Sequence, residues 1–283
     1  MSITVAETAA ELRLALGSQR VALVPTMGAL HAGHLALVAR ASELVERGVV
    51  DTVVVSIFVN PLQFARGEDL DAYPQTRDED LAALSSTGVG FAFLPTAAEM
   101  YPNGVLETRV TAGAVGELFE GASRAGHFEG VLTAVAKLVN IARAHVVVFG
   151  QKDAQQVFLV ERMVRELSMP TQVLVVETVR EHSGLALSSR NRYLNEKEHR
   201  AARVLSLALE AAVSSADRGI DAVLAAAQSV IMGERLVKLD YLAIVNPATF
   251  RPVDDGYRGH ARVLIAASVG STRLIDNEAI RLA

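Results

Sequence analysis

The 283-residue sequence contains no cysteine, and this absence excludes whole classes of chemistry. A disulfide framework and thiolate catalysis are both impossible, and the composition suits a reducing compartment. Apolar runs long enough to span a membrane are also missing, because the longest runs are strand-sized and are interrupted by charges such as Asp51. The first residues do not show the basic and then apolar pattern of a signal peptide. We therefore expect a cytoplasmic protein without a membrane partner.

An excess of positive charge is absent as well, since 27 Lys and Arg residues stand against 32 Asp and Glu residues. The net charge of -5 argues against a general nucleic-acid surface and favours small anions as partners. Internal repeats and low-complexity linkers are not found. Because 51% of the residues are hydrophobic and 21% are charged, we expect a folded chain with room for two domains.

Strand-like apolar runs alternate with amphipathic helical stretches in the first two thirds of the chain. This alternation predicts an α/β fold with a Rossmann-like, mostly parallel sheet that is covered by helices. The expected strands are Val21–Val24, Val53–Val59, Val89–Leu94, Val146–Phe149 and Val173–Val176, and the expected helices include Val131–Ala142 and Val157–Leu167.

The pattern changes at about Val179. Two alanine-rich helical stretches are followed by three strand candidates, and this order is typical of a smaller α+β domain with a short antiparallel sheet. The helical stretches are Glu196–Ala216 and Asp221–Met232, and the strand candidates are Leu239–Val245, Arg262–Ala267 and Arg273–Ile275. We therefore predict an N-terminal domain of residues 1–178 and a C-terminal domain of residues 179–283.

The most informative segment follows the first of these strands and reads PTMGALHAGH, from Pro25 to His34. It predicts a strand, a glycine-containing loop and a helix, and the amino end of such a helix favours an anion such as a phosphate. Gly33 lacks a Cβ and lets a phosphate approach the backbone. His31 and His34 lie three residues apart and can reach the same side of the first turn. The pair can donate to phosphoryl oxygens, cap the helix, or supply two of the ligands of a metal site.

Two further strands end in polar residues. Because ligands of parallel sheets bind at the carboxyl ends of the strands, these ends are candidate sites. The strand Val53–Val59 leads to Asn60 and Gln63, and the strand Val146–Phe149 leads to the turn GQKDAQQ, residues 150–156. In that turn, a lysine can reach a phosphate and an aspartate can accept hydrogen bonds from a ribose, although a solvated turn pair is an equal alternative.

Two more segments are candidates for contacts with a ligand. The polar stretch Ala65–Glu79 is expected to form a mobile loop over the site. The cluster Ser188-Ser189-Arg190 is suited to an anion, because arginine can bind phosphate with two parallel hydrogen bonds. A helix cap is the alternative for this cluster, but Asn195, with Glu198 three residues later, already predicts a capping box at the next helix.

Taken together, six segments resemble the pantothenate synthetases, also called the pantoate-beta-alanine ligase family, and they occur in the order found in that family. The resemblance covers nearly the whole chain. The H-x-G-H element alone indicates only the wider nucleotidyl-transferring superfamily. The six segments are PTMGALHAGH, SIFVNPLQF, HFEGV at residues 127–131, GQKDAQQ, LSSRNRYL and RLIDN at residues 273–277.

The resemblance implies ATP-dependent condensation of (R)-pantoate with β-alanine to pantothenate through a pantoyl adenylate, with release of AMP and pyrophosphate. It implies His34 as a proton donor, and His31, Lys152 and Arg190 as further catalytic residues on the phosphates. Gln63 and Gln156 are implied to bind pantoate, Gln63 also touching β-alanine. The residues implied to bind ATP are Met27, Gly28, Ala29, Leu30, His31, Ala32, Gly33, His34, Gly150, Gln151, Lys152, Asp153, Val179, Leu187, Ser188, Ser189 and Arg190. Asn60, Tyr73, Arg124 and His127 match neighbours of the pocket without an assigned role.

The chemistry of the triphosphate leads us to expect Mg²⁺ held mainly by phosphate oxygens and water, with no metal site made of protein ligands. The resemblance also implies a homodimer. The chain departs from the family at one turn, where Gln151 replaces the usual glutamate and Ala154 the usual aromatic residue. Two alternatives stay open: a nucleotidyltransferase that leaves AMP in its product, and a catalytically silent nucleotide-binding protein. Because Lys152, Asp153 and Gln156 are retained, we expect activity to persist.

Overall fold

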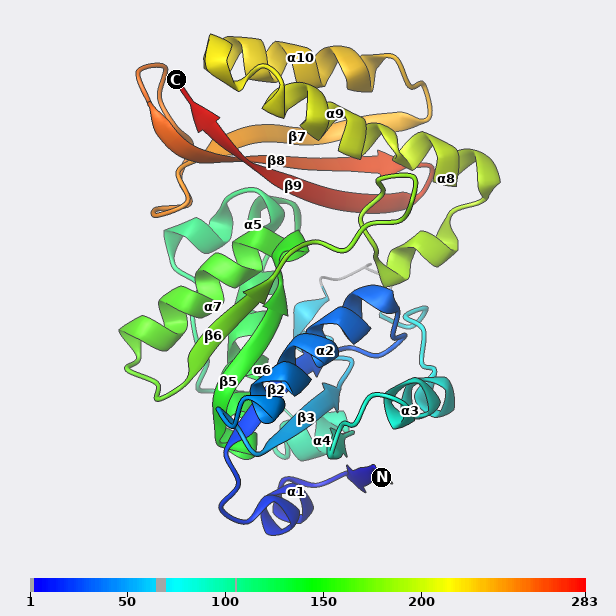
Figure 1. Cartoon of the computed structure of the whole chain (residues 1–283), viewed down its shortest axis with the longest axis vertical. Coiled ribbons are helices and arrows are strands. Elements are labelled where there is room, and N and C mark those ends of the chain that lie inside the picture. The colour runs from blue at the N-terminus through cyan, green and yellow to red at the C-terminus, as the bar shows by residue number, and fades with distance from the viewer. Residues whose placement is uncertain (1–2, 65–69, 105) are drawn as a thin grey trace. The chain divides into compact units, whose positions relative to one another are not determined.

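The computed structural model describes residues 3–64, 70–104 and 106–283, and it divides the chain into two compact units (Figure 1). Unit 1 contains the chain up to Gln151 together with Gln155–Glu177. Unit 2 contains Thr178–Ala283 together with the short segment Lys152–Ala154. The predicted domain boundary between residues 178 and 179 stays a prediction.

Within the described residues, unit 1 forms a six-stranded parallel sheet with the strand order β1-β4-β3-β2-β5-β6. The predicted α/β fold with a parallel sheet is therefore confirmed. Its five predicted strands all form, whereas β1 is only three residues long and has too short an apolar pattern to be predicted. The strands are β1 (Thr4–Ala6), β2 (Val21–Thr26), β3 (Thr52–Ile57), β4 (Phe91–Phe93), β5 (Ala144–Gly150) and β6 (Gln172–Val176).

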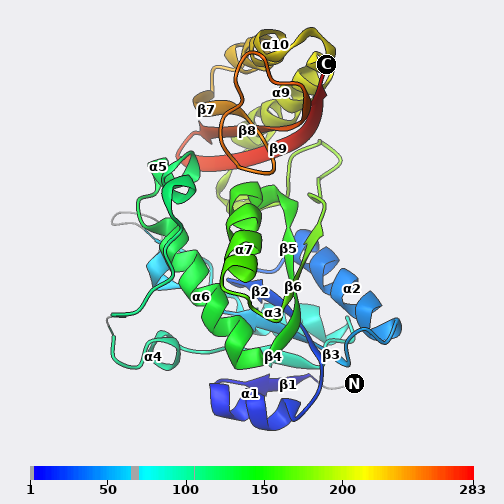
Figure 2. The ribbon, with the colours of Figure 1, turned by 90° about the vertical axis from the view of Figure 1, so that its left-hand side faces the viewer.

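Helices cover both faces of this sheet, and Figure 2 shows α6 and α7 on the opposite side of the strands from α2. Buried side chains of α2 and α3 pack on one face, among them Val38 and Leu84. On the other side, α1 contacts α6. The helices are α1 (Ala9–Leu16), α2 (Ala32–Glu46), α3 (Arg77–Ser85), α4 (Ala97–Met100), α5 (Glu120–Ser123), α6 (His127–Ala142) and α7 (Ala154–Glu166), and the 3-10 helices are η1 (Pro61–Gln63), η2 (Ala114–Glu117) and η3 (Gln151–Asp153).

The strand order places a topological switch point between β2 and β5. From β2 the chain continues to β3 and β4 on one side, whereas β5 and β6 extend the sheet on the other side. At such a point the loops that follow the two neighbouring strands run in opposite directions and leave a crevice for a ligand. The loop between β2 and α2 and the turn at Gln151–Asp153 both follow strands at this point.

Unit 2 has a three-stranded antiparallel sheet in the order β7-β8-β9, as predicted for an α+β C-terminal part. The last strand extends beyond the predicted residues Arg273–Ile275. The prediction ends at Ile275 because the polar residues Asp276 and Asn277 interrupt the apolar pattern, although both are buried. The predicted helix Glu196–Ala216 is divided at Arg203. The elements are η4 (Ser189–Tyr193), α8 (Glu196–Ala202), α9 (Val204–Val213), η5 (Ala216–Arg218), α10 (Ile220–Met232), β7 (Val237–Val245), β8 (Gly259–Val269) and β9 (Thr272–Leu282).

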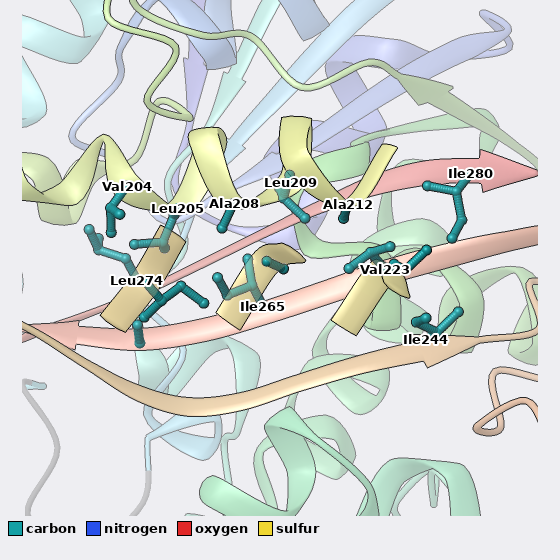
Figure 3. Close-up of a cluster of buried hydrophobic side chains, with 14 of the residues drawn as sticks. Val204, Leu205, Ala208, Leu209, Ala212, Val223, Ile244, Ile265, Leu274 and Ile280 are labelled. Atoms are coloured by element: carbon teal, nitrogen blue, oxygen red, sulfur yellow. The ribbon is translucent and has the colours of Figure 1, made fainter. Parts of the chain in front are cut away.

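The core of unit 2 lies between its helices and its sheet (Figure 3). Leu205 and Leu209 of α9 pack among the same buried side chains as Ile265 of β8 and Leu274 of β9. Full burial of one such side chain stabilises the fold by about 1.5–3 kcal/mol. The helix α8 begins with the predicted capping box of Asn195 and Glu198. In the part of the chain that the structure describes, no helix is long and apolar enough to cross a membrane.

Candidate active site

The loop between β2 and α2 has an unusual backbone. Gly28 has a φ of 84° and Ala29 a φ of 50°, so two successive residues lie in the left-handed region. Glycine adopts this conformation readily, whereas for alanine it costs roughly 1–2 kcal/mol. A Cβ on Gly28 would also lie 3.0 Å from Oδ2 of Asp80 and 3.1 Å from Cγ2 of Ile57. The loop is therefore a tightly packed, strained connection that needs other groups to hold it.

His31 and His34 form a reciprocal cap at the start of α2. Nδ1 of His31 accepts from the amide of Gly33 at 3.1 Å, and Nδ1 of His34 accepts from the amide of His31 at 3.4 Å. The ring centroids lie 4.0 Å apart. The cap, which is one of the three alternatives for this pair, is thus present in the structure. The hydrogen bonds of the cap use the Nδ1 atom of each ring.

The cap also determines the tautomer of both rings. A ring nitrogen that accepts a hydrogen bond carries no proton, so each neutral imidazole holds its proton on Nε2. The turn therefore carries two Nε2–H donors on rings that are in contact. Such donors suit the negatively charged oxygens of a phosphate at the amino end of a helix.

Asp80 of α3 supports this loop, although no motif in the sequence points to it. Its side chain is buried, and it accepts from the amides of Ala29 at 3.0 Å and Leu30 at 2.7 Å. Asp80 lies in an acidic first turn that is separated from the loop by about 50 residues, so no local pattern links the two. The expected loop Ala65–Glu79 overlaps this helix, which begins at Arg77, and residues 65–69 lie outside the described part of the chain.

Asn60 is a buried structural residue at the end of β3. Its Nδ2 donates to the carbonyl of Gly130 at 3.0 Å, and its Oδ1 accepts from the amide of Leu62 and from the hydroxyl of Tyr101 at 2.7 Å. Burial raises the pKa of Tyr101 to about 12, so the hydroxyl remains a donor well into the alkaline range. Asn60 therefore fixes the 3-10 helix η1, which carries Gln63.

The backbone of Gln63 is held by one residue at the start of α6 and by another that lies just before this helix. Nδ1 of His127 lies 2.7 Å from the carbonyl oxygen of Gln63, and Nη2 of Arg124 donates to the same oxygen at 3.2 Å. Gly130 allows the backbone of α6 to lie close to η1, because a Cβ at this position would lie 2.0 Å from the carbonyl oxygen of Leu62. The structure thus gives Arg124 and His127 a role in positioning Gln63. Tyr73 is buried and packs edge-on against Phe64, 5.8 Å between ring centroids.

The turn after β5 is tied to β9 by the segment RLIDN. Nδ2 of Asn277 donates to the carbonyl of Lys152 at 2.9 Å, and Nη1 of Arg262 donates to Oδ1 of Asn277. The ammonium group of Lys152 lies 3.9 Å from Oδ1 of Asp153, a long ion pair at the edge of the usual limit. Lys152 is therefore fixed through its backbone.

The two adjacent glutamines of α7 differ in their surroundings. Gln155 is buried and bridges α7 to neighbouring backbone, since it accepts from the amide of Glu120 and donates to the carbonyls of Val115 and Leu118. Gln156, the residue implied to bind pantoate, is only partly buried. Gln155 thus has a structural role that the sequence alone does not separate from that of its neighbour.

The segment Val179–Leu187 of unit 2 folds back on itself. The amide of Leu187 donates to the carbonyl of Val179, and the amide of Glu181 donates to the carbonyl of Leu185, both at 2.9 Å. Arg180 anchors the segment to β9 through two hydrogen bonds to Asp276, at 2.6 and 3.0 Å. The two ends of the segment implied to bind adenine are therefore brought together within unit 2.

Ser188 caps a short helix of its own. Its hydroxyl accepts from the amide of Arg190 at 3.2 Å at the start of η4, which is separate from the helix capped by Asn195. Ser189 and Arg190 both lie in η4 and are partly buried. The cap and the predicted anion contacts of this cluster are compatible, because the cap uses only the hydroxyl of Ser188.

The structure brings the predicted residues together in groups. In unit 1, the segment Met27–His34 forms one group, and Gln63 with Arg124 and His127 forms another. In unit 2, Lys152 and Asp153 lie at one turn, and Val179 and Leu187 pair directly. Among the described residues, no group of three or more histidine, aspartate or glutamate side chains could hold a metal ion.

Comparison with known proteins gives a consistent result along the chain. Residues 3–279 match the family model of pantoate-beta-alanine ligase. A pantothenate synthetase of Leifsonia xyli subsp. xyli is 60% identical over 265 residues, which cover 94% of this chain and 90% of that protein. The crystal structure of pantothenate synthetase from Thermus thermophilus is similar with a TM-score of 0.91 at 45% identity, covering 98% of this chain and 99% of that one.

A third similar protein carries bound ligands. The crystal structure of pantoate-beta-alanine ligase from Francisella tularensis, described as complexed with beta-gamma ATP and beta-alanine, has a TM-score of 0.79 at 32% identity. The match covers 98% of this chain and 97% of that one. The similarity thus extends over both units.

Proposed function

The chain belongs to the pantoate-beta-alanine ligase family, and we propose that the residues at the polar ends of β2, β3 and β5 carry out the reaction of that family. The enzyme condenses pantoate with β-alanine at the expense of ATP. The observation that carries the assignment to these residues is the reciprocal cap of His31 and His34, which presents two Nε2–H donors at the topological switch point.

The first step forms a pantoyl adenylate. A carboxylate oxygen of (R)-pantoate attacks the α-phosphorus of ATP, and the bond to the bridging oxygen breaks so that pyrophosphate leaves. Negative charge accumulates on the phosphoryl oxygens during this step. We assign His34 as the donor to these oxygens, with His31 beside it and with Lys152 and Arg190 as further phosphate ligands.

The second step forms the amide. The amine of β-alanine attacks the acyl carbon, the bond from that carbon to the phosphate oxygen breaks, and AMP leaves with this oxygen while the nitrogen loses a proton. No covalent bond to the protein is needed, so the protein acts through positioning and charge. We assign Gln63 and Gln156 to pantoate, with Gln63 also next to β-alanine, because an amide can donate to a carboxylate and accept from a hydroxyl.

The remaining assignments concern ATP. We propose Met27–His34 and Gly150–Asp153 for the phosphates and ribose, with Asp153 on the ribose hydroxyls. In unit 2 we propose the backbone of Val179 for adenine, and Leu187–Arg190 for adenine and the triphosphate. The pairing of Val179 with Leu187 supports this proposal, since it presents both residues from one folded segment.

We also propose that Mg²⁺ enters with ATP, and that the enzyme is a cytoplasmic homodimer. The donor set fits this mode of metal binding: the groups assigned to the phosphates are imidazole, ammonium and guanidinium, and the buried carboxylate of Asp80 already accepts two amides. Mg²⁺ would then be held by phosphate oxygens and water and would neutralise phosphate charge. The cysteine-free sequence agrees with a reducing compartment, and the dimer is expected from the family.

Isotope exchange tests the first step by itself. With Mg²⁺ and ATP present and β-alanine omitted, labelled pyrophosphate should exchange into ATP only when pantoate is added, because exchange requires reversible adenylate formation. A folded protein without pantoate-dependent exchange would contradict the ligase assignment. Exchange that persists despite Gln151 and Ala154 would show that the altered turn permits catalysis.

A further inference from the structure

Asp80 makes contacts that the reaction described above does not use. Its two carboxylate oxygens accept from two successive backbone amides, those of Ala29 and Leu30, at 3.0 and 2.7 Å. The residue is 2% exposed. A buried carboxylate that accepts two backbone amides makes strong, charge-assisted hydrogen bonds and defines the orientation of both peptide groups.

The two amides belong to the part of the loop that most needs support. Ala29 has a positive φ, and the residue that follows Leu30 is His31, which caps α2. A change of backbone angle at either amide would move the imidazoles of His31 and His34, because no flexible residue lies between Leu30 and the cap. The carboxylate is therefore placed where it controls the start of α2.

Asp80 is itself held firmly. It lies in the first turn of α3, and its amide donates to the carbonyl of Thr76 at 2.8 Å. Leu84, one turn later, is fully buried in the cluster that packs α2 and α3 onto the sheet. A continuous set of contacts thus runs from the sheet through α3 and Asp80 to the loop.

We propose that Asp80 is a positioning residue for adenylate formation, which holds the loop after β2 so that the Nε2–H groups of His31 and His34 meet the phosphates. This inference rests on the proposed function of the two histidines. In this proposal Asp80 does not contact ATP. A misplacement of about 1 Å at reacting groups can lower a rate by about 100-fold, so loss of this support should be visible in the chemistry.

The variant Asp80→Asn tests the proposal, because it keeps the size of the side chain and replaces one acceptor by an NH₂ group that faces an amide donor. We expect pantoate-dependent pyrophosphate exchange to fall by about 10–100-fold, with the KM for pantoate within about twofold of the parent. Asp221→Asn is the matched control, since Asp221 is an exposed carboxylate in the first turn of another helix, α10, and the variant should keep the parent rate. If the asparagine variant does not fold, Asp80→Ser retains one acceptor in a smaller side chain for the same comparison.

Hydrogen exchange at the peptide covering residues 26–35 gives a readout that does not depend on activity. These amides should exchange about tenfold faster in Asp80→Asn than in Asp221→Asn, at a temperature where both variants are folded. If Asp80 only stabilised the fold, Asp80→Asn would lower the unfolding temperature and leave the rate of the folded enzyme unchanged. That result would overturn the proposal. Unchanged hydrogen exchange would also overturn it. Absence of pyrophosphate exchange in the parent would instead contradict the proposed function, and the hydrogen-exchange comparison would still decide the role of Asp80.

Discussion

Replacing His34 with alanine should slow the formation of pantoyl adenylate by about 10²–10³-fold, the effect of removing one donor to a developing negative charge. The fold should persist, because the hydrogen bond that His34 accepts from the amide of His31 is long, at 3.4 Å, and the side chain is only partly buried. Single-turnover measurement of adenylate with excess enzyme reports this step directly.

Two further variants separate chemistry from capping. His34→Gln keeps an acceptor at the third helical position, where glutamine is a usual partner in a capping box, and should recover any stability lost in His34→Ala without recovering the parent rate. His260→Ala removes an exposed imidazole of β8 and should leave the rate unchanged. Adenylate formation near the parent rate in His34→Ala would refute the assigned role.

Replacing Arg180 with methionine should lower the free energy of unfolding by about 3–5 kcal/mol, the usual effect of breaking a buried ion pair. The side chain of Asp276 is 2% exposed and accepts two hydrogen bonds from Arg180. Without the guanidinium, the buried carboxylate would keep one backbone donor, the amide of Asn277 at 2.8 Å. Urea unfolding of the full chain measures the change.

The same sheet supplies a matched control. Arg273 pairs with Asp240 at 2.7 Å near the surface, and Arg273→Met should cost only about 0–1 kcal/mol. The double variant Arg180→Met with Asp276→Leu should regain most of the loss, because it removes the buried charge as well. Arg180→Met should also raise the KM for ATP, since Arg180 anchors the segment between Val179 and Leu187. If Arg180→Met and Arg273→Met lowered the free energy of unfolding equally, the stabilising role assigned to the ion pair of Arg180 and Asp276 would be contradicted.

The elements of the fold could be predicted because their signals are local. Apolar runs such as Val21–Val24 mark buried strands, and the residues that follow them mark the carboxyl edge of the sheet. For this reason the amino-acid pattern alone singles out the segment at His31 and His34. The extent of β9 could not be predicted, because the buried Asp276 pairs with Arg180, almost one hundred residues away in the chain.

The contacts that support the site could not be predicted from the sequence, for the same reason. Asp80 and Asn277 each act on a backbone group that is remote in the chain, and neither lies in a periodic pattern that points to its partner. Gln155 and Gln156 are chemically identical, and only the tertiary structure shows that the first one is used to join α7 to neighbouring backbone. Sequence reasoning identifies candidate chemical groups, whereas the groups that orient them depend on long-range packing.

Transfer of oxygen from pantoate to AMP tests the acyl-adenylate mechanism most directly. The experiment uses pantoate labelled with ¹⁸O in both carboxylate oxygens, together with Mg²⁺, ATP and β-alanine, and the AMP is analysed by mass spectrometry. We expect one ¹⁸O atom in each AMP and one retained in the amide of pantothenate, because the carboxylate oxygen that attacks the α-phosphorus stays with AMP when the amine attacks. Unlabelled AMP, or label found in inorganic phosphate, would contradict the pantoyl adenylate and with it the roles assigned to His31 and His34.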